Sequence, residues 1–116
     1  VVAIFAHQMR QGIRPAIFGN GKKTRDYIYV GDVAHANVLA LTRAAGHTMN
    51  ISTGHETTDL QVFEAAARMC SYEGMPRFTK IRPGEARRSA LANSRAHRLL
   101  GWKPKRTLEQ AIKLTV

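Results

Sequence analysis

Two arginines and one glutamate have the side-chain types and settings that binding a phosphorylated ligand requires. Arg25 follows a glycine turn and two lysines, and Arg82 lies in an Arg-Pro-Gly-Glu turn whose acid is Glu85. A guanidinium presents planar, paired donors that match phosphate oxygens, so two of them brought together would suit a diphosphate. The Glu85 carboxylate is able to accept hydrogen bonds from ribose hydroxyls, although neutralisation of its basic neighbours explains its presence equally well.

Positive charge is concentrated in one stretch of the chain. Ten of the 18 lysines and arginines fall within residues 77–106, where Glu85 is the only acid, so ten cations against one anion leave a formal +9 of the chain's +10. Clustered cations add their fields, whereas dispersed ones are screened. The stretch therefore predicts a site for an anionic ligand.

The sequence contains none of the common catalytic or cofactor-binding motifs. The segment 19–24 superficially suggests a phosphate loop, but it leads into a strand rather than a helix, and Ala16 stands where the first Walker glycine would be, so we expect a hairpin-like turn. No tyrosine has a lysine four residues on, the five histidines lack metal-ligand spacing, and the eight acids are dispersed. We expect no catalytic group, metal site or cofactor site among these residues.

Composition indicates a single ordered domain of 116 residues with 44% hydrophobic residues and a small core. The one cysteine, Cys70, excludes an internal disulfide and lies on an apolar helical stripe, which suggests a buried thiol in a reducing compartment. No apolar run has membrane-spanning length and no signal peptide is visible, so we expect a cytoplasmic protein without a membrane partner. The chain opens without methionine, directly in a helical pattern, and we expect a piece of something longer.

Helical and strand patterns alternate along the chain. Helices are expected over residues 1–11, from Asp32 as N-cap to about 44, from a Thr58–Gln61 capping box, from Asn93–Ser94 to 100, and from a Thr107–Gln110 capping box. Strands are expected at 15–18, 25–30, 47–52 and 77–81. This predicts an α/β chain, 1–116, with helices on a short, mixed sheet, but too few strands for a doubly wound fold.

Five blocks in this order, 17–34, 50–54, 82–89, 93–96 and 100–104, carry a family resemblance that covers essentially the whole chain. They resemble the C-terminal half of the NAD-dependent epimerase/dehydratase family of extended short-chain dehydrogenases, most closely its UDP-glucose 4-epimerase-like members. The resemblance implies a UDP-sugar substrate. It places Arg25 and Arg82 on the diphosphate, Glu85 on the ribose, and Ala16 and Phe18 against the uracil.

Arg87 and Arg88 offer further phosphate contacts, although solvated surface charge is the favoured role for at least one of them. In the complete enzymes the N-terminal Rossmann half holds NAD and the Tyr-x-x-x-Lys pair, and these motifs do not occur here. We therefore expect inactivity of this chain alone, with a Rossmann half supplied elsewhere or a homodimer as partner. The reaction, whether epimerase, dehydratase, reductase or decarboxylase, stays open.

Two readings from other classes compete with the nucleotide-sugar interpretation. A sequence pI near 10.7 is typical of a small basic module that binds the phosphate backbone of nucleic acid. Against this, no helix-turn-helix, zinc-finger or RNA-recognition pattern is visible, and Trp102 is more simply a core anchor. The third reading is a structural or oligomerisation module, because a missing Rossmann half would leave apolar surface exposed.

Overall fold

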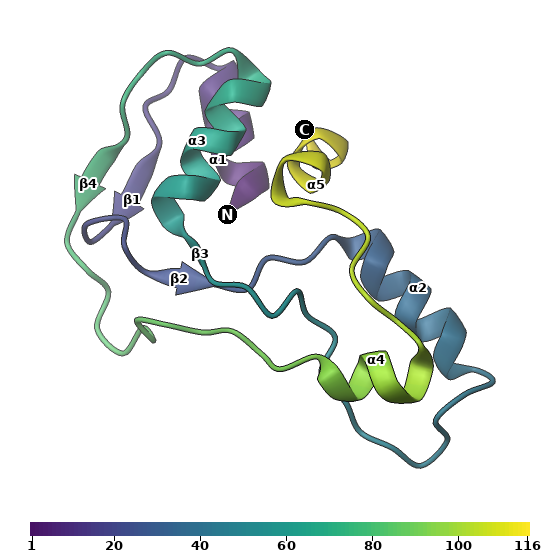
Figure 1. Cartoon of the computed structure of the whole chain (residues 1–116). Helices are drawn as coiled ribbons and strands as arrows, with labels where there is room; N and C mark the ends of the chain where they lie inside the picture. Colours follow the sequence, from purple (N-terminus) through teal and green to yellow (C-terminus); the bar gives the residue numbers. More distant parts are fainter.

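The computed structural model describes all residues 1–116 and confirms the α/β class (Figure 1). The elements, in chain order, are α1 (Val2–Arg10), β1 (Ala16–Phe18), β2 (Thr24–Arg25), α2 (Val30–Ala40), β3 (Thr57–Thr58), α3 (Asp59–Cys70), β4 (Arg77–Thr79), α4 (Ser94–Leu100) and α5 (Leu108–Thr115). None of these helices combines the length and the apolar character needed to cross a membrane.

The expected short mixed sheet takes the form of two separate strand pairs. β1 pairs with β4 in parallel, and β2 pairs with β3 in antiparallel. The hairpin expected at segment 19–24 is wrong, because β1 and β2 belong to different sheets and do not pair. The turn instead carries the chain from one sheet to the other, with Gly19 and Gly21 at positive φ.

Two predicted strands are shorter or absent. β2 ends at Arg25, so residues 26–29 are irregular, and segment 47–52 forms no strand. β-propensity alone does not make a strand, because a strand also needs a neighbouring backbone to pair with. Neither residues 26–29 nor segment 47–52 pairs with another strand in the structure.

Both predicted capping boxes are present. The Thr58 hydroxyl accepts from the Gln61 N–H at 3.1 Å, and the Gln61 side chain accepts from the Thr58 N–H at 2.8 Å. Thr107 and Gln110 repeat the arrangement at 3.3 and 3.0 Å. Each box satisfies two backbone donors that the first turn of a helix leaves free, so these helix starts are determined locally.

Asp32 does not cap α2, contrary to expectation. The helix begins at Val30, and Asp32 lies buried in its first turn. Its carboxylate accepts the N–H groups of Lys105 and Arg106 at 3.0 and 3.1 Å, and its carbonyl accepts the Trp102 indole N–H at 2.9 Å. Asp32 therefore joins α2 to a segment about 70 residues away in the chain, a tertiary role that no local pattern indicates.

The buried apolar side chains form two clusters. The larger one joins α1, α3, α5 and β1, and includes an edge-to-face contact between Phe5 and Phe63 with ring centroids 5.8 Å apart. The smaller one joins α2 and α4 around Trp102, which is 1% exposed and confirms the prediction of a core anchor. Figure 1 shows the two groups at opposite ends of the molecule.

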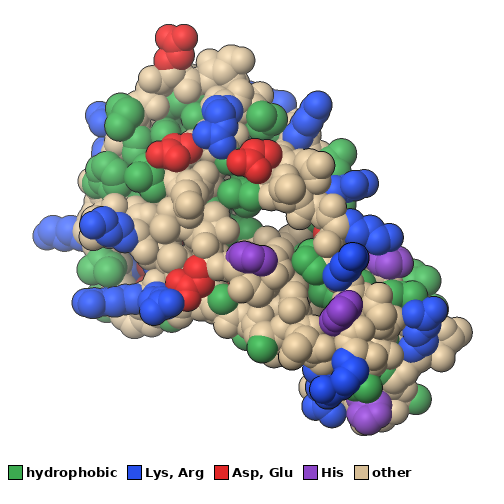
Figure 2. Space-filling model, in the orientation of Figure 1, with side chains coloured by type: hydrophobic (Ala, Val, Ile, Leu, Met, Phe, Trp, Pro, Cys, Tyr) green, Lys and Arg blue, Asp and Glu red, His purple; other side chains and the backbone are tan.

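The molecule is thin for its size. Its principal extents are 47 × 30 × 15 Å, and its radius of gyration of 16.1 Å exceeds the roughly 13 Å of a compact domain of this length. Its accessible surface of 7700 Å² is about a fifth above the roughly 6,300 Å² typical of a monomer of this mass. Figure 2 shows an opening between the two groups. Much apolar surface consequently stays exposed.

The Asp26 carboxylate holds the middle of the molecule together. Its oxygens accept the backbone N–H groups of Thr53 at 2.8 Å, Gly54 at 2.9 Å and Leu91 at 3.4 Å, together with the Thr53 hydroxyl at 2.5 Å. Three segments distant in sequence therefore meet at one side chain. Because Arg25 immediately precedes Asp26, this junction also fixes the backbone beside a predicted site residue.

We expect Asp26→Asn to lower the free energy of unfolding by about 2 kcal/mol, because the substitution turns one acceptor into a donor facing backbone N–H groups and removes the charge that strengthens the others. Urea unfolding followed by circular dichroism measures the change. Glu64→Gln is the matched control, since Glu64 is exposed and has no ion pair. Equal stabilities of the two variants would contradict the role given to Asp26.

Candidate functional site

All five residues predicted to contact ligand line one cavity of about 360 Å³. They come from β1, β2 and the loop after β4, and are Ala16, Phe18, Arg25, Arg82 and Glu85. We call this space the inner cavity. Parallel pairing of β1 with β4 brings the two halves of the set together, because it places the end of β4, which leads into the Arg-Pro-Gly-Glu turn, beside Phe18.

The loop that carries Arg82 and Glu85 is anchored to β2. An Arg25 guanidinium nitrogen donates to the Ala86 carbonyl at 2.8 Å, and the Thr24 N–H donates to the Arg87 carbonyl at 3.0 Å. Arg88 forms a bidentate pair with Glu56, with contacts of 2.7 to 3.1 Å. These hydrogen bonds, rather than strand pairing, hold the loop over the sheets.

The two predicted phosphate-binding arginines differ in how they are held. The Arg82 guanidinium carbon lies 3.8 Å from the centroid of the Phe18 ring, a cation–π contact that leaves its N–H donors without protein acceptors. Arg25 uses one terminal nitrogen for the carbonyls of Thr24 and Ala86, at 2.7 and 2.8 Å. Its other nitrogens remain available, so both side chains retain donors for an oxyanion.

Glu85 forms an ion pair with Lys23, a residue that the sequence analysis did not select. The Lys23 ammonium lies 2.7 Å from one Glu85 oxygen and 3.4 Å from Asp59. The hydrogen bond from Lys23 holds the pKa of Glu85 below its ordinary value, with the charges of Arg82 and Arg25 acting in the same direction. Glu85 is therefore ionised at neutral pH, and its second oxygen has no hydrogen-bond partner in the protein.

Tyr27 and Asp59 also line the inner cavity and were missed by the sequence analysis. Burial, the negative charge of Asp59 and a hydrogen bond to it raise the pKa of Tyr27 to about 12, although Arg25 opposes the shift. Tyr27 lies two residues after Arg25 in a segment predicted as a strand, where that spacing places side chains on one face. That two-residue spacing was the sequence signal that could have identified Tyr27. Asp59 had no comparable signal beyond its place at the start of a helix.

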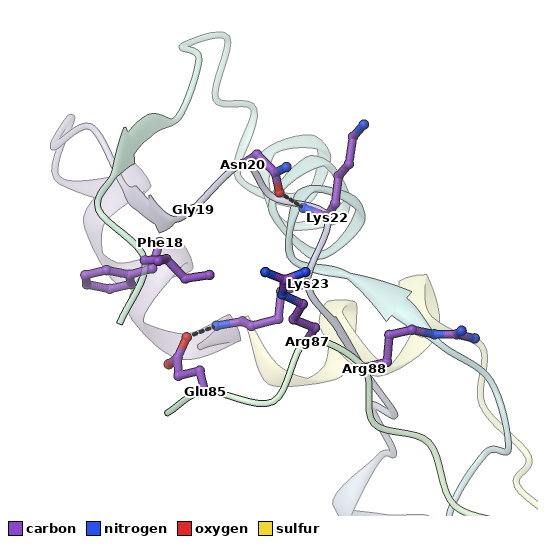
Figure 3. Close-up of a pocket in the computed structure, with 9 residues that line it drawn as sticks. Phe18, Gly19, Asn20, Lys22, Lys23, Glu85, Arg87 and Arg88 are labelled. Carbon is purple, nitrogen blue, oxygen red and sulfur yellow. Dashed lines mark hydrogen bonds and ion pairs between the residues drawn. The ribbon is translucent and has the colours of Figure 1, made fainter. Parts of the chain in front are cut away.

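A second cavity, of about 520 Å³, lies on the other side of the Lys23–Glu85 pair, and we call it the outer cavity. Four of its lining side chains are cations, Lys22, Lys23, Arg87 and Arg88. Figure 3 shows them around the glycine turn and the loop. Arg87 and Arg88, expected as further phosphate contacts, thus line a different cavity from Arg25 and Arg82.

The remaining reactive side chains form no site. No group of three or more metal-ligating side chains occurs in the chain. Cys70 is partly buried against the larger cluster, with its sulfur 4.0 Å from the Ala6 carbonyl oxygen. Cys70 was expected to be buried, and the structure leaves it partly exposed.

Comparison with known proteins gives consistent matches. Residues 1–115 match the family model for GDP-mannose 4,6 dehydratase. The UDP-glucose 4-epimerase of Mycolicibacterium smegmatis is 41% identical over 117 residues, which cover all of this chain and 37% of that enzyme. The dTDP-glucose 4,6-dehydratase of Haemophilus influenzae is 34% identical over 113 residues, covering 86% of this chain and 33% of that enzyme.

A solved structure agrees with these matches. The crystal structure of the UDP-glucose 4-epimerase of Thermotoga maritima with UDP-glucose has a TM-score of 0.95 and 41% identity, covering 98% of this chain and 37% of that one. The chain thus spans little more than a third of the length of these relatives. With nearly every residue matched and the fold shared, the chain belongs to the GDP-mannose 4,6 dehydratase family and corresponds to the C-terminal portion of the extended short-chain dehydrogenase fold of epimerases and dehydratases.

Proposed function

We propose that this chain is the UDP-sugar-binding portion of a UDP-glucose 4-epimerase-like, NAD-dependent epimerase or dehydratase. The observation that carries the proposal is the meeting of Ala16, Phe18, Arg25, Arg82 and Glu85 around the inner cavity. Its volume lies within the range of roughly 300–1,000 Å³ of small-molecule sites. The Thermotoga maritima relative, whose crystal structure is described as a complex with UDP-glucose, supports the ligand class.

The inner cavity has a distribution of charge suited to such a ligand. Its charged lining residues are the cations Lys23, Arg25 and Arg82 and the anions Glu85 and Asp59, a formal excess of one positive charge. In our proposal the free guanidinium donors of Arg25 and Arg82 bind the diphosphate, and the unpaired Glu85 oxygen accepts from the ribose. Ala16 and Phe18 pack against the base.

The NAD-dependent chemistry does not fit the residues present. The glycine turn after β1 joins two strands, whereas a dinucleotide fingerprint joins a strand to a helix. No Tyr-x-x-x-Lys pair occurs in the sequence. We therefore assign binding and orientation of the nucleotide to this chain. Hydride transfer and the catalytic groups belong, in our proposal, to the part of such enzymes that this chain does not span.

We expect UDP and UDP-glucose to bind saturably in calorimetric titrations at low salt, and uridine, which lacks the diphosphate, to bind far more weakly. Arg82→Ala is expected to weaken UDP binding about 10- to 100-fold, corresponding to a lost charge-assisted hydrogen bond of roughly 1.5–3 kcal/mol. Arg82 donates no hydrogen bond within the protein, so its removal leaves the loop anchors intact.

Arg95→Ala is the control for total charge, because Arg95 is exposed on α4 and has no ion pair. Arg82→Lys separates charge from geometry, since an ammonium lacks the paired donors. The proposal is wrong if uridine binds as tightly as UDP, or if Arg95→Ala costs as much affinity as Arg82→Ala.

The pH dependence of binding gives a second test. The pKa of Glu85 is depressed below its ordinary value of 4.5 by Lys23, so the contribution of its carboxylate is present above that value and is lost as the pH falls further. We expect UDP-glucose affinity to be constant from pH 7 to about 5 and to decline below about 4.5. Glu85→Gln should lack this decline. A midpoint near pH 6 in the unsubstituted chain would exclude Glu85 as the responsible group.

The nucleic-acid alternative loses support in the structure. The basic stretch contains two aromatic side chains that could stack on bases, Phe78 and Trp102, of which Trp102 is buried and only Phe78 is exposed. A single ring offers no platform for successive bases. Within the basic stretch, Arg88 is neutralised by Glu56, so the free charge of the stretch is less continuous than the sequence suggests.

A structural or oligomerisation role remains a second candidate, favoured by the exposed apolar side of α2. Val30, Val38 and Leu41 are 74%, 62% and 83% exposed, and surface of this kind drives association.

We expect the purified chain to self-associate as its concentration rises, and Leu41→Glu to shift it toward monomer because a charge opposes burial. Light scattering after size exclusion measures the mass, with Thr42→Glu as the exposed polar control. A monomer at every concentration would rule out association through this face.

A further inference from the structure

The outer cavity has cations that the inner cavity does not use. Lys22, Arg87 and Arg88 line only the outer cavity, whereas Arg25 and Arg82 line only the inner one. Phe18, Lys23 and Glu85 line both cavities and lie where the two meet. The two groups of cations therefore face different spaces and are able to bind different anions.

Within the outer cavity, Arg87 is the cation best placed to bind. Lys23 is paired with Glu85, and Arg88 with Glu56, so neither has an uncompensated charge. The side chains of Arg87 and Lys22 have no ion pair or hydrogen bond within the protein. Figure 3 shows Arg87 rising from the loop into the space beside Lys23, while Lys22 extends upward, away from Arg87, and Arg88 extends to the right.

The glycine turn contributes polar groups to the same space. The Asn20 side-chain oxygen accepts the Lys22 N–H at 3.1 Å, which fixes the amide and leaves its NH₂ group as a donor. Gly19 has positive φ and brings backbone close to the cavity. Glu85, at the inner wall, repels an anion and so favours a position toward Arg87 and Asn20.

We propose that the outer cavity is a second anion site, which binds a phosphate-class oxyanion between Arg87 and Asn20, with Lys22 as a neighbouring charge, independently of the nucleotide in the inner cavity. Arg87 supplies paired donors matched to the oxyanion, Lys22 adds a mobile charge, and the Asn20 amide adds a neutral donor. The Lys23–Glu85 pair, with no net charge, separates this anion from the diphosphate proposed on the other side and reduces their mutual repulsion.

Inorganic pyrophosphate is the probe, titrated at low salt while backbone amides are followed by two-dimensional NMR. We expect two sets of shifts, one at Asn20, Lys22 and Arg87 and one at Arg25 and Tyr27. Arg87→Ala should weaken the first set about tenfold, as expected for one lost charge-assisted hydrogen bond, and leave the second unchanged. Arg82→Ala should do the reverse.

The two proposals fail separately in this experiment. Shifts confined to Arg25 and Tyr27, lost in Arg82→Ala, would overturn the outer site and leave the proposed function standing. Shifts confined to Asn20 and Lys22, lost in Arg87→Ala, would support the outer site and count against the inner one. Equal weakening by the remote Arg95→Ala would show diffuse charge rather than a site and would overturn the inference. Melting temperatures of the variants establish that each is folded.

Discussion

The Asp26 carboxylate is the junction on which the rest of the structure depends. Four strands of two or three residues form only two short ladders, so most segments are not joined by backbone pairing. Asp26 instead collects backbone donors from Thr53, Gly54 and Leu91. Asp32 does the same for Lys105 and Arg106. A charged acceptor strengthens such hydrogen bonds. The side chains of Asp26 and Asp32 therefore join segments that strand pairing does not join.

This way of building the middle of the molecule explains where the candidate site lies. Asp26 fixes the backbone that follows Arg25, and Arg25 in turn donates to the Ala86 carbonyl of the loop that carries Arg82 and Glu85. The site is thus assembled from a strand end and a loop that share one hydrogen-bonded connection. The molecule is thin for a related reason. Few of its segments pair as strands, and neither hydrophobic cluster encloses the space between the two clusters.

The Lys23–Glu85 pair gives the site its electrostatic character. The pair neutralises two charges between the cavities. It also holds the pKa of Glu85 below its ordinary value, so the carboxylate stays ionised. One of its oxygens has no hydrogen-bond partner in the protein. The remaining cations then divide, with Arg25 and Arg82 on the inner side and Arg87 on the outer side. Arg82 and Arg87, which lie five residues apart in the basic stretch, therefore line different cavities.

The sequence by itself determined the family resemblance, the two capping boxes and the selection of five candidate ligand contacts, because these depend on local motifs and side-chain types. Only the tertiary structure decided that the glycine turn links two sheets, that Asp32 is a buried acceptor, and that Lys23 pairs with Glu85. Each of these depends on a partner far away in the chain, as the separation of 62 residues between Lys23 and Glu85 shows. A local sequence pattern does not show which distant residue a side chain contacts in the folded chain.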